Sequence, residues 1–328
     1  MGEPAGIGGE TTLLAWRRRY ETGSPVFFVI DDPQRLGRLA GLLGWEVPIQ
    51  AIGAPDDAMR VFADALPVLP LPQPVASEPG RLDPANAEAV LEAIRQGVAL
   101  TLEGTAAGVV TNPIHKLVLM ESGFEHPGHT EFLAELCASE QPPVMMLACA
   151  ALRVVPVTVH LPLRRVPEVL TTEGIVQAGR VTAQALQRRF GIAAPRLAIS
   201  GLNPHAGEGG RLGNEESTII APAVRRLQED GIAAFGPVPA DTLFHAAARR
   251  NYDAALCMYH DQALIPIKTI DFDGGVNVTL GLPIIRTSPD HGTALDIAGQ
   301  GTASPASLEA ALRTAAEMSA ASQAFTHR

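Results

Sequence analysis

The sequence predicts an α/β protein whose core is a layered sheet. Short apolar runs rich in β-branched residues alternate along the chain with longer amphipathic patterns, as strands alternate with helices in such proteins. Neither an internal repeat nor a low-complexity linker interrupts this alternation. The 328 residues, 46% of them hydrophobic, suffice for one large core or for two subdomains. No single boundary is visible, so two subdomains would require the chain to cross between them more than once.

Each expected element follows from its local pattern. Helical periodicity covers Thr11–Tyr20, Asn86–Leu102, Thr172–Phe190, Ser217–Glu229 and Pro305–Ala321. Asp83 and Pro84 supply an N-cap and a first helical residue for the second of these helices. The proline-rich stretch from Pro67 to Pro79 predicts an irregular connection. Apolar, β-leaning runs predict strands over Val26–Ile30, Gly108–Thr111, Val144–Ala148, Arg153–Val159, Leu197–Ser200, Ala254–Met258 and Val276–Leu280.

Composition excludes several classes of protein. A formal charge of −10 argues against binding nucleic acid by general electrostatics, and an anionic substrate would need locally placed positive charge. No apolar run approaches the roughly 20 residues that span a bilayer, and the first residues lack the pattern of a signal peptide. We therefore expect no membrane association. Three cysteines without paired spacing fit a reducing cytoplasm and argue against disulfides: Cys137, Cys149 and Cys257.

Lysine is rare in this chain. Of 25 basic residues only Lys116 and Lys268 are lysines, and both lie in segments rich in His, Asn, Asp and Gly. A coding bias towards arginine explains the overall imbalance. Under such a bias, a lysine that persists indicates a position where a compact ammonium is chemically required.

Three histidines follow apolar, strand-like runs. They are His160, His205 and His260. Ligands of open α/β sheets collect at the carboxyl ends of strands, and three neutral imidazoles there can hold a divalent metal while leaving positions open for substrate. The alternative is three unrelated polar residues at strand ends, since no local spacing ties them together.

Two further sets of residues indicate an anion site. His129 and Thr130 open an apolar helix after a turn, where backbone N–H groups suit an anion, although an ordinary helix cap explains the same pattern. Lys268, Asn277 and Arg286 combine an ammonium, an amide and a guanidinium that can bind phosphate or carboxylate, or else are surface polar groups. The glycine-rich stretch Ala206–Asn214 is an anion cradle or a mobile loop.

Nucleotide-binding fingerprints are missing. The chain contains neither G-x-x-x-x-G-K-[ST] nor G-x-G-x-x-G. A nicotinamide dinucleotide would therefore need a binding mode other than the Rossmann one.

Taken together, these segments resemble the 4-hydroxythreonine-4-phosphate dehydrogenase family. None of the stretches decides alone, but they run in family order over nearly the whole chain. The matching stretches are Gly2–Gly8, Thr111–Lys116, Pro127–Glu131, His160–Leu163, Gly201–Gly209, Pro239–Thr242, Tyr259–Gln262, Gly275–Pro283 and Asp290–Ala294.

The resemblance implies a fold and a set of site residues. The fold is isocitrate/isopropylmalate-dehydrogenase-like, with two α/β subdomains and a cleft between them, and the protein is a homodimer whose active sites draw on both subunits. His160, His205 and His260 bind the divalent metal. The segment from His291 to Gly299 is similar to a nucleotide-binding loop, with contacts from His291, Gly292, Thr293, Ala294 and Leu295. The phosphorylated substrate contacts His129, Thr130, Lys268, Asn277 and Arg286.

The resemblance also implies a reaction. It is the NAD- or NADP-dependent oxidation of 4-phosphooxy-L-threonine to 2-amino-3-oxo-4-phosphooxybutanoate, which decarboxylates to 3-amino-2-oxopropyl phosphate in pyridoxal phosphate biosynthesis. A divalent metal (Zn, Mg or Co) acts as Lewis acid. The candidates for general base are Lys116, Asp241 and Asp290.

Other functions stay open. A dehydrogenase of threonate or erythronate phosphate would use the same metal and phosphate groups. A metal-dependent aldolase or phosphatase can also use three histidines and a phosphate clamp, and would form no reduced nicotinamide. A non-catalytic phosphometabolite-binding protein is the third alternative, which the intact metal, lysine and loop segments disfavour.

The amino terminus departs from the family pattern. Members usually carry an apolar strand immediately before the Gly-Glu-Pro-Ala-Gly-Ile-Gly motif, whereas this sequence begins at the motif. The motif at Gly2–Gly8 is typical of a strand-to-helix loop. We expect the first strand to be absent, and a version extended upstream to be more stable.

Overall fold

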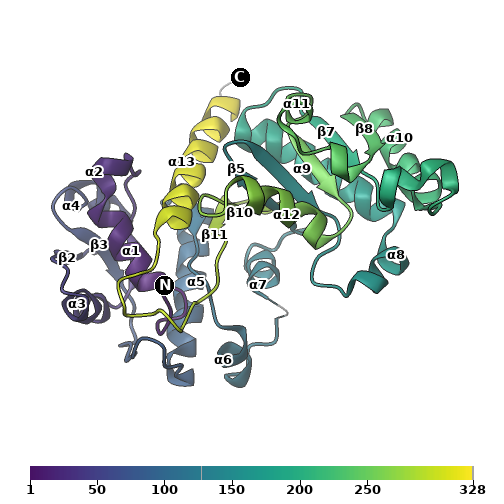
Figure 1. Ribbon diagram of the computed structural model, residues 1–328. Coiled ribbons are helices and arrows are strands. Elements are labelled where there is room, and N and C mark those ends of the chain that lie inside the picture. Colours follow the sequence, from purple (N-terminus) through teal and green to yellow (C-terminus); the bar gives the residue numbers. More distant parts are fainter. Residues whose placement is uncertain (127, 327–328) are drawn as a thin grey trace. The chain divides into compact units, whose positions relative to one another are not determined.

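The computed structural model describes residues 1–126 and 128–326, and the chain divides into two compact units (Figure 1). Unit 1 contains Met1–Pro143 and Leu282–Glu317, and unit 2 contains Val144–Gly281 and the residues from Met318 onward. Strands and helices alternate in both, so the predicted α/β class is confirmed. Within the described ranges, none of the helices has the length and apolar character that a membrane span requires.

Unit 1 has two sets of parallel strands. β1 (Val29–Asp31), β3 (Leu66–Pro70) and β2 (Ile49–Ala51) form a sheet in that order, and β4 (Val109–Val110) pairs with β11 (Arg286–Pro289). Helix α13 (Ala306–Thr326) begins in unit 1, and its last residues belong to unit 2. The other helices of unit 1 are α1 (Gly8–Arg17), α2 (Arg19–Thr22), α3 (Pro33–Leu42), α4 (Ala58–Val61), α5 (Ala87–Leu102), α6 (Lys116–Glu121) and α7 (His129–Leu136).

Side-chain alternation along the strands builds the core of unit 1. Val29 and Val68 face α1 and α3, where Leu13 and Leu36 are fully buried. The next residue of β1, Ile30, points to the opposite face and packs against Ala93 of α5. Helices therefore cover both faces of these strands, as in a parallel sheet that is buried on both sides.

The proline-rich segment corrects one prediction. Leu66–Pro70, at its start, is not irregular but forms β3, the central strand of its sheet. Pro67 and Pro70 cannot donate to the ladder, but the amides that flank them do, from Leu66 to the Pro48 carbonyl and from Leu71 to the Asp31 carbonyl. Tertiary pairing on both edges overrides the weak strand propensity of proline.

Unit 2 is a mixed sheet with the strand order β10-β5-β6-β9-β7-β8. β10 (Val276–Leu280), β5 (Val144–Cys149) and β6 (Leu152–Pro156) pair antiparallel, whereas β6, β9 (Ala254–Cys257), β7 (Arg196–Ser200) and β8 (Ala233–Val238) are parallel neighbours. The helices of this unit are α8 (Val166–Val169), α9 (Thr172–Phe190), α10 (Ala221–Glu229), α11 (Ala246–Arg249) and α12 (His260–Ile270).

Helices also cover both faces of the unit 2 sheet. Ala255 and Cys257 pack against α12, and the alternate residues of β9 point to the other face, where Figure 1 shows α9. Helices α9 and α10 approach so closely that a Cβ on Gly179 would lie 2.7 Å from Leu227 Cδ2. The four parallel strands of this sheet, β6, β9, β7 and β8, have their carboxyl ends at the same edge.

The remaining element predictions differ in quality. Helix α9 and strand β10 have the predicted bounds, and Asp83 accepts a hydrogen bond from the Ala85 N–H at 3.0 Å, as an N-cap does. The helix expected from Ser217 opens with a π-helical turn, Glu216–Ile220, before α10. β2, β8 and β11 are short or rich in polar residues and small residues, which gave no strand signal.

A buried ion pair joins three segments of unit 1. Arg35 of α3 donates to Asp31 through Nε (2.9 Å) and Nη2 (2.6 Å), and its Nη1 donates to the Pro4 carbonyl at 3.3 Å. The two side chains are only 4% and 2% exposed. The pair links α3 to the end of β1 and to the amino-terminal motif.

We expect Arg35→Met to destabilise unit 1 by about 3–5 kcal/mol, because the change leaves the Asp31 carboxylate buried without its partner. The exposed Arg38, whose ion pair with Asp32 is 3.9 Å long, is the matched control and should cost under about 1 kcal/mol as Arg38→Met. Both tryptophans, Trp16 and Trp45, lie in unit 1, so their fluorescence during urea unfolding measures the effect. Equal losses in the two variants would contradict the assignment.

Candidate active site

The predicted metal ligands follow three neighbouring parallel strands of unit 2. His160 comes after β6, His260 after β9 and His205 after β7, in the spatial order β6-β9-β7. Asp241 follows β8, the next strand, and lies in the short turn Ala240–Thr242. The carboxyl ends of parallel strands meet at one sheet edge, which is where α/β proteins bind ligands. Tertiary structure thus gathers four candidates at one edge.

Two of the histidines lie side by side. The imidazole centroids of His160 and His260 are 5.8 Å apart, with ring planes 42° apart. His260 Nδ1 lies 2.7 Å from Asp261 Oδ1, so the carboxylate orients the ring and leaves Nε2 for a ligand. A carboxylate behind an imidazole is the usual support of a metal-binding histidine.

The third histidine lies in a strained loop. His205, Ala206, Gly207, Glu208 and Gly209 all have positive φ, between 43° and 77°. Non-glycine residues pay roughly 1–2 kcal/mol each for this left-handed conformation. Among residues 1–126 and 128–326, no three His, Cys, Asp or Glu side chains form a cluster ready to hold a metal. The pair His160–His260 is assembled, and His205 does not complete it in this conformation.

A buried carboxylate that the sequence did not reveal supports this loop. Glu216, 6% exposed, accepts hydrogen bonds from the Leu202 N–H (2.8 Å), the Asn203 N–H (2.7 Å) and Asn203 Nδ2 (3.0 Å). A Cβ at Gly207 would lie 2.6 Å from Glu216 Oε2, so only glycine fits there. Glu216 therefore fixes the segment that carries His205.

A buried amide, also missed, ties two strand ends together. Gln262 Oε1 accepts from the Met258 N–H at 2.6 Å and from Ser200 Oγ at 2.7 Å, and Nε2 donates to the Gly201 carbonyl at 2.8 Å. Met258 lies between β9 and His260, and Gly201 lies between β7 and His205. Gln262 lies in the stretch Tyr259–Gln262, which matches the family pattern. Nothing in that stretch indicates that its side chain links the ends of two strands.

Unit 1 contains a buried cation. Arg286 is 4% exposed and donates through Nε (3.2 Å) and Nη2 (2.8 Å) to Thr111 Oγ1. Burial lowers the pKa of Arg286 to about 10, so the guanidinium is still charged at neutral pH. Thr111, which opens the stretch ending at Lys116, was not among the predicted site residues.

The charge of Arg286 also acts on His129. This histidine is the first residue of α7, after the N-cap Gly128, and its Nε2 is buried without a hydrogen-bond partner. Burial, and then the charge of Arg286, hold the pKa of His129 well below its usual value. Thr130 is the second residue of α7, whereas Pro127 of the same motif lies outside the described residues. An orphaned imidazole nitrogen, a buried guanidinium and a helix start suit an anion.

The other predicted phosphate ligands belong to unit 2. Lys268 lies in the last turn of α12, with Nζ 5.0 Å from the centre of the Phe272 ring, and Asn277 lies on β10. The set expected to bind substrate is therefore divided, with His129, Thr130 and Arg286 in unit 1 and Lys268 and Asn277 in unit 2.

The predicted nucleotide loop packs on the amino-terminal motif. The Ile7 N–H donates to the Thr293 carbonyl at 3.0 Å, and a Cβ on Gly6 would lie 2.7 Å from that oxygen. His291 keeps Nδ1 3.0 Å from the Gly292 carbonyl and has a buried, unpartnered Nε2. The segment also includes Ala294, with a φ of 43°, and Leu295. The amino-terminal motif Gly2–Gly8 thus supports the segment from His291 to Leu295.

The three candidates for general base are divided between the two units. Lys116 begins α6 and is exposed, and Asp290 follows β11 and donates its N–H to Ser307 Oγ at 3.0 Å, both in unit 1. Only Asp241 shares the sheet edge of the histidines. It is exposed.

Comparison with known proteins gives consistent results. A family model described as pyridoxal phosphate biosynthetic protein PdxA matches residues 24–315. The 4-hydroxythreonine-4-phosphate dehydrogenase of Bradyrhizobium diazoefficiens is 55% identical over 332 residues, covering 98% of this chain and 96% of the relative. The enzyme of the same name from Methylorubrum populi is 57% identical over 321 residues, with 96% and 92% coverage.

A solved structure agrees in fold. The crystal structure of 4-hydroxythreonine-4-phosphate dehydrogenase from Klebsiella pneumoniae superposes with a TM-score of 0.86 at 36% identity. The match covers 97% of this chain and 98% of that one.

We expect Gln262→Leu to destabilise unit 2 by about 3 kcal/mol or more, because three buried polar groups lose their partner at roughly 1–3 kcal/mol each. Gln262→Glu keeps the accepting oxygen and should lie between wild type and Gln262→Leu. Gln228, an exposed residue that makes one bond to the Ala234 carbonyl, is the control, with a loss under about 1 kcal/mol as Gln228→Leu. Far-ultraviolet circular dichroism during denaturation measures all three. A wild-type midpoint for Gln262→Leu would exclude the bridging role.

Stability should fall in acid through His129. Its folded pKa is depressed, so below the unfolded value of about 6.5 the unfolded chain takes up a proton that the folded chain refuses. The contribution is complete above that pH and is lost towards pH 5 at up to about 1.4 kcal/mol per pH unit. The variant His129→Phe lacks this titrating group. Its free energy of unfolding should therefore fall less than that of the wild type when the pH is lowered from 8 to 5. Parallel pH curves for the two proteins would contradict it.

Proposed function

Because the chain belongs to the pyridoxal phosphate biosynthetic protein PdxA family, we propose that it is a 4-hydroxythreonine-4-phosphate dehydrogenase. It would oxidise 4-phosphooxy-L-threonine to 2-amino-3-oxo-4-phosphooxybutanoate, which decarboxylates to 3-amino-2-oxopropyl phosphate. The observation that carries the proposal is the sheet edge of unit 2, where imidazoles follow neighbouring parallel strands. The chain that contains this edge is 55% identical to a relative of that name.

The imidazole donors fit a divalent metal such as Zn or Co, and fit Mg less well because Mg prefers oxygen ligands. His160 and His260 are close enough to share an ion, and Asp261 supports His260 from behind. His205 would complete the set through a change in its left-handed loop. A metal held by these histidines would supply Lewis acidity towards the substrate hydroxyl, and a bound nicotinamide would supply the oxidant.

Charge-assisted hydrogen bonds would hold the phosphate. Arg286 and the α7 start with His129 and Thr130 offer them in unit 1, and Lys268 and Asn277 offer them in unit 2. The buried guanidinium explains how a chain with a net charge of −10 attracts an anion locally. Phosphate is thus a positioning handle, whose binding energy holds the reacting carbon in place.

One side chain would take the hydroxyl proton as hydride leaves C3. Asp241 is the candidate at the histidine edge, with Lys116 and Asp290 as the alternatives. The new C3 carbonyl is β to the C1 carboxylate, so the C1–C2 bond breaks and its electrons flow towards that carbonyl. The proton taken from the hydroxyl balances the one that C2 gains, and carbon dioxide leaves.

The segment from His291 to Leu295 would bind NAD or NADP. Its support comes from the amino-terminal motif, through the Ile7–Thr293 hydrogen bond and the close approach of Gly6. This location replaces the missing Rossmann fingerprint. The enzyme would act in the cytoplasm, in keeping with free cysteines and the small metabolite substrate.

We also propose a homodimer with shared active sites. Large apolar side chains are exposed beside the site residues: Leu163 and Ile265 are each 65% exposed, close in sequence to His160 and Lys268. Contiguous apolar patches mark surfaces that pack against a partner, and we propose that these two side chains belong to such a patch. Light scattering should give twice the chain mass at assay concentration. A fully active monomer would refute the shared site.

The reaction is tested by following reduced nicotinamide and carbon dioxide together. We expect equal amounts of both from 4-phosphooxy-L-threonine with either NAD or NADP and an added divalent metal. The unphosphorylated amino acid should lose most of the rate. Threonate and erythronate phosphates are the comparison substrates, and faster turnover of either would reassign the enzyme. Turnover without carbon dioxide would sink the proposed reaction.

Metal binding is tested separately, by equilibrium dialysis of the single variants His160→Ala, His205→Ala and His260→Ala. Loss of a residue that only supports a metal ligand typically weakens metal affinity by roughly 10–100-fold, so loss of a ligand itself should weaken it by at least as much. His245, an exposed histidine that caps α11, is the matched control, and its Ala variant should bind as wild type does. Full activity after exhaustive chelation would remove the metal from the reaction.

A further inference from the structure

The chain between β11 and α13 is a long irregular loop. It covers residues 290–305 and includes three left-handed residues, Ala294 (φ 43°), Gly299 (φ 75°) and Gly301 (φ 72°). Connections longer than about 12–15 residues that contain no helix or strand are usually functional. The proposed nucleotide contacts, His291–Leu295, occupy the first part of this loop. The position of its second part therefore affects the same ligand.

Glu10 attaches the second part of the loop to helix α1. Its Oε2 accepts a hydrogen bond from the Gly299 N–H at 2.9 Å, between residues that are 289 positions apart in sequence. The first part is attached to the start of the same helix, through the bond from the Ile7 N–H to the Thr293 carbonyl. The start of α1 thus holds the loop at two points.

The carboxylate of Glu10 is buried and only partly satisfied. The residue is 1% exposed, and within the described part of the chain its Oε1 has no hydrogen-bond partner. Burying a carboxylate in this way is costly, although its position in the first turn of α1 offsets part of the cost, because a helix N-terminus favours negative charge. An amide or a hydroxyl could accept the single bond from Gly299 at a lower cost. A buried polar group that is left under-satisfied calls for a functional explanation.

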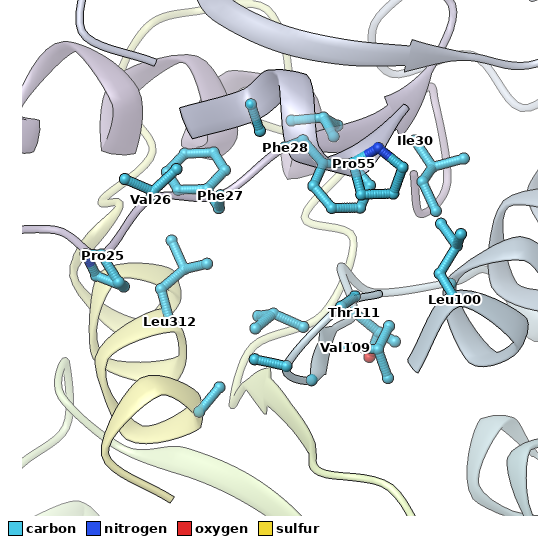
Figure 2. A pocket seen from close by; sticks show the side chains of 18 of the residues that line it. Pro25, Val26, Phe27, Phe28, Ile30, Pro55, Leu100, Val109, Thr111 and Leu312 are labelled. Atoms are coloured by element: carbon cyan, nitrogen blue, oxygen red, sulfur yellow. The ribbon is translucent and has the colours of Figure 1, made fainter. Parts of the chain in front are cut away.

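The apolar cavity of unit 1 lies on another side of α1. It has a volume of about 370 Å³, and Figure 2 shows Leu100 and Leu312 pointing towards it. Its lining residues all lie outside the segment His291–Gly299, and Thr12 of α1 is one of them. Thr12 follows Glu10 by two residues, so at roughly 100° per residue their side chains leave the helix on nearly opposite sides. Glu10 therefore faces the loop and not the cavity.

We propose that Glu10 is a positioning residue for the dinucleotide, an inference that rests on the proposed nucleotide site at His291–Leu295. By holding Gly299, it keeps the loop in the conformation that receives the nucleotide, without touching the ligand itself. The apparent affinity of a ligand falls with the fraction of the protein that is in the binding-competent conformation. Releasing this end of the loop therefore weakens nucleotide binding and leaves the chemistry at the reacting carbon unchanged.

The test measures the dissociation constants of NADH and NADPH in variants of the full chain. Glu10→Met removes the accepting oxygen, and we expect the constant of the preferred nucleotide to rise by about tenfold or more, because a hydrogen bond to a charged group shifts the loop population by that factor. Glu10→Gln keeps an accepting oxygen and should lie closer to the wild type. Glu309→Met is the matched control and should bind as the wild type does. Glu309 is 7% exposed and also has an unpartnered Oε1, but its ion pair is with Arg18 rather than with the loop.

Gly299→Ala tests the same bond from the side of the loop. A Cβ there would lie 2.6 Å from Pro79 Cβ, at a φ of 75°, so the change displaces the amide from Glu10 and leaves α1 unaltered. We expect the same loss of affinity as in Glu10→Met, and no further loss in the double variant, because both changes remove one bond. The value of kcat at saturating nucleotide should change by less than about twofold. If Glu10→Met does not fold, Gly299→Ala carries the test.

Amide hydrogen exchange separates this role from the nucleotide site itself. In the wild type, NADH or NADPH should slow exchange across His291–Gly299, and without nucleotide Glu10→Met should speed exchange of the Gly299 amide. Wild-type affinity in Gly299→Ala and in folded Glu10→Met, with the loop protected in the wild type, would overturn the role of Glu10 alone. Nucleotide that leaves the exchange of the wild-type loop unchanged would overturn the nucleotide site and this inference together. An equal loss of affinity in Glu309→Met would indicate general destabilisation and would also contradict the role.

Discussion

The buried amide of Gln262 is the constraint on which the histidine edge of unit 2 depends. A single side chain satisfies a backbone N–H after β9, a hydroxyl at the end of β7 and the carbonyl that follows it. Without such a bridge, two loops that leave neighbouring strands would be free to diverge, because the parallel pairing between β9 and β7 ends at Leu256 and Ile199. Gln262 thus fixes the backbone segment that leads to His260 relative to the one that leads to His205.

Beyond that base the two histidines are held in different ways. His260 begins a helix and is held by Asp261, so its ring orientation is set before any ligand arrives. His205 sits in a left-handed turn that is strained in three non-glycine residues and supported by the buried Glu216. Strain that the surroundings maintain is typical of functional segments. Under the proposed function, the adjacent His160 and His260 and the strained His205 loop would together supply the metal ligands.

Electrostatics in unit 1 follow a different logic. Arg286 is buried and donates to the Thr111 hydroxyl, and burial, followed by the charge of Arg286, disfavours protonation of His129. A buried imidazole nitrogen that lacks a hydrogen-bond partner is costly to maintain. Under the proposed function, a phosphate bound near His129 would meet locally placed positive charge in a strongly acidic chain.

The sequence by itself determined the alternation of strands and helices, the bounds of α9 and β10, and the residue types expected of the site. These features depend on local periodicity, capping and motif chemistry, as at Asp83 and around His260. Tertiary structure alone decided that Leu66–Pro70 is a central strand, that β6, β9, β7 and β8 end at one edge, and that His129 Nε2 is buried within range of the Arg286 charge. Gln262, Glu216 and Thr111 act through partners distant in sequence, and no local pattern encodes which backbone groups will surround a side chain once the chain has packed.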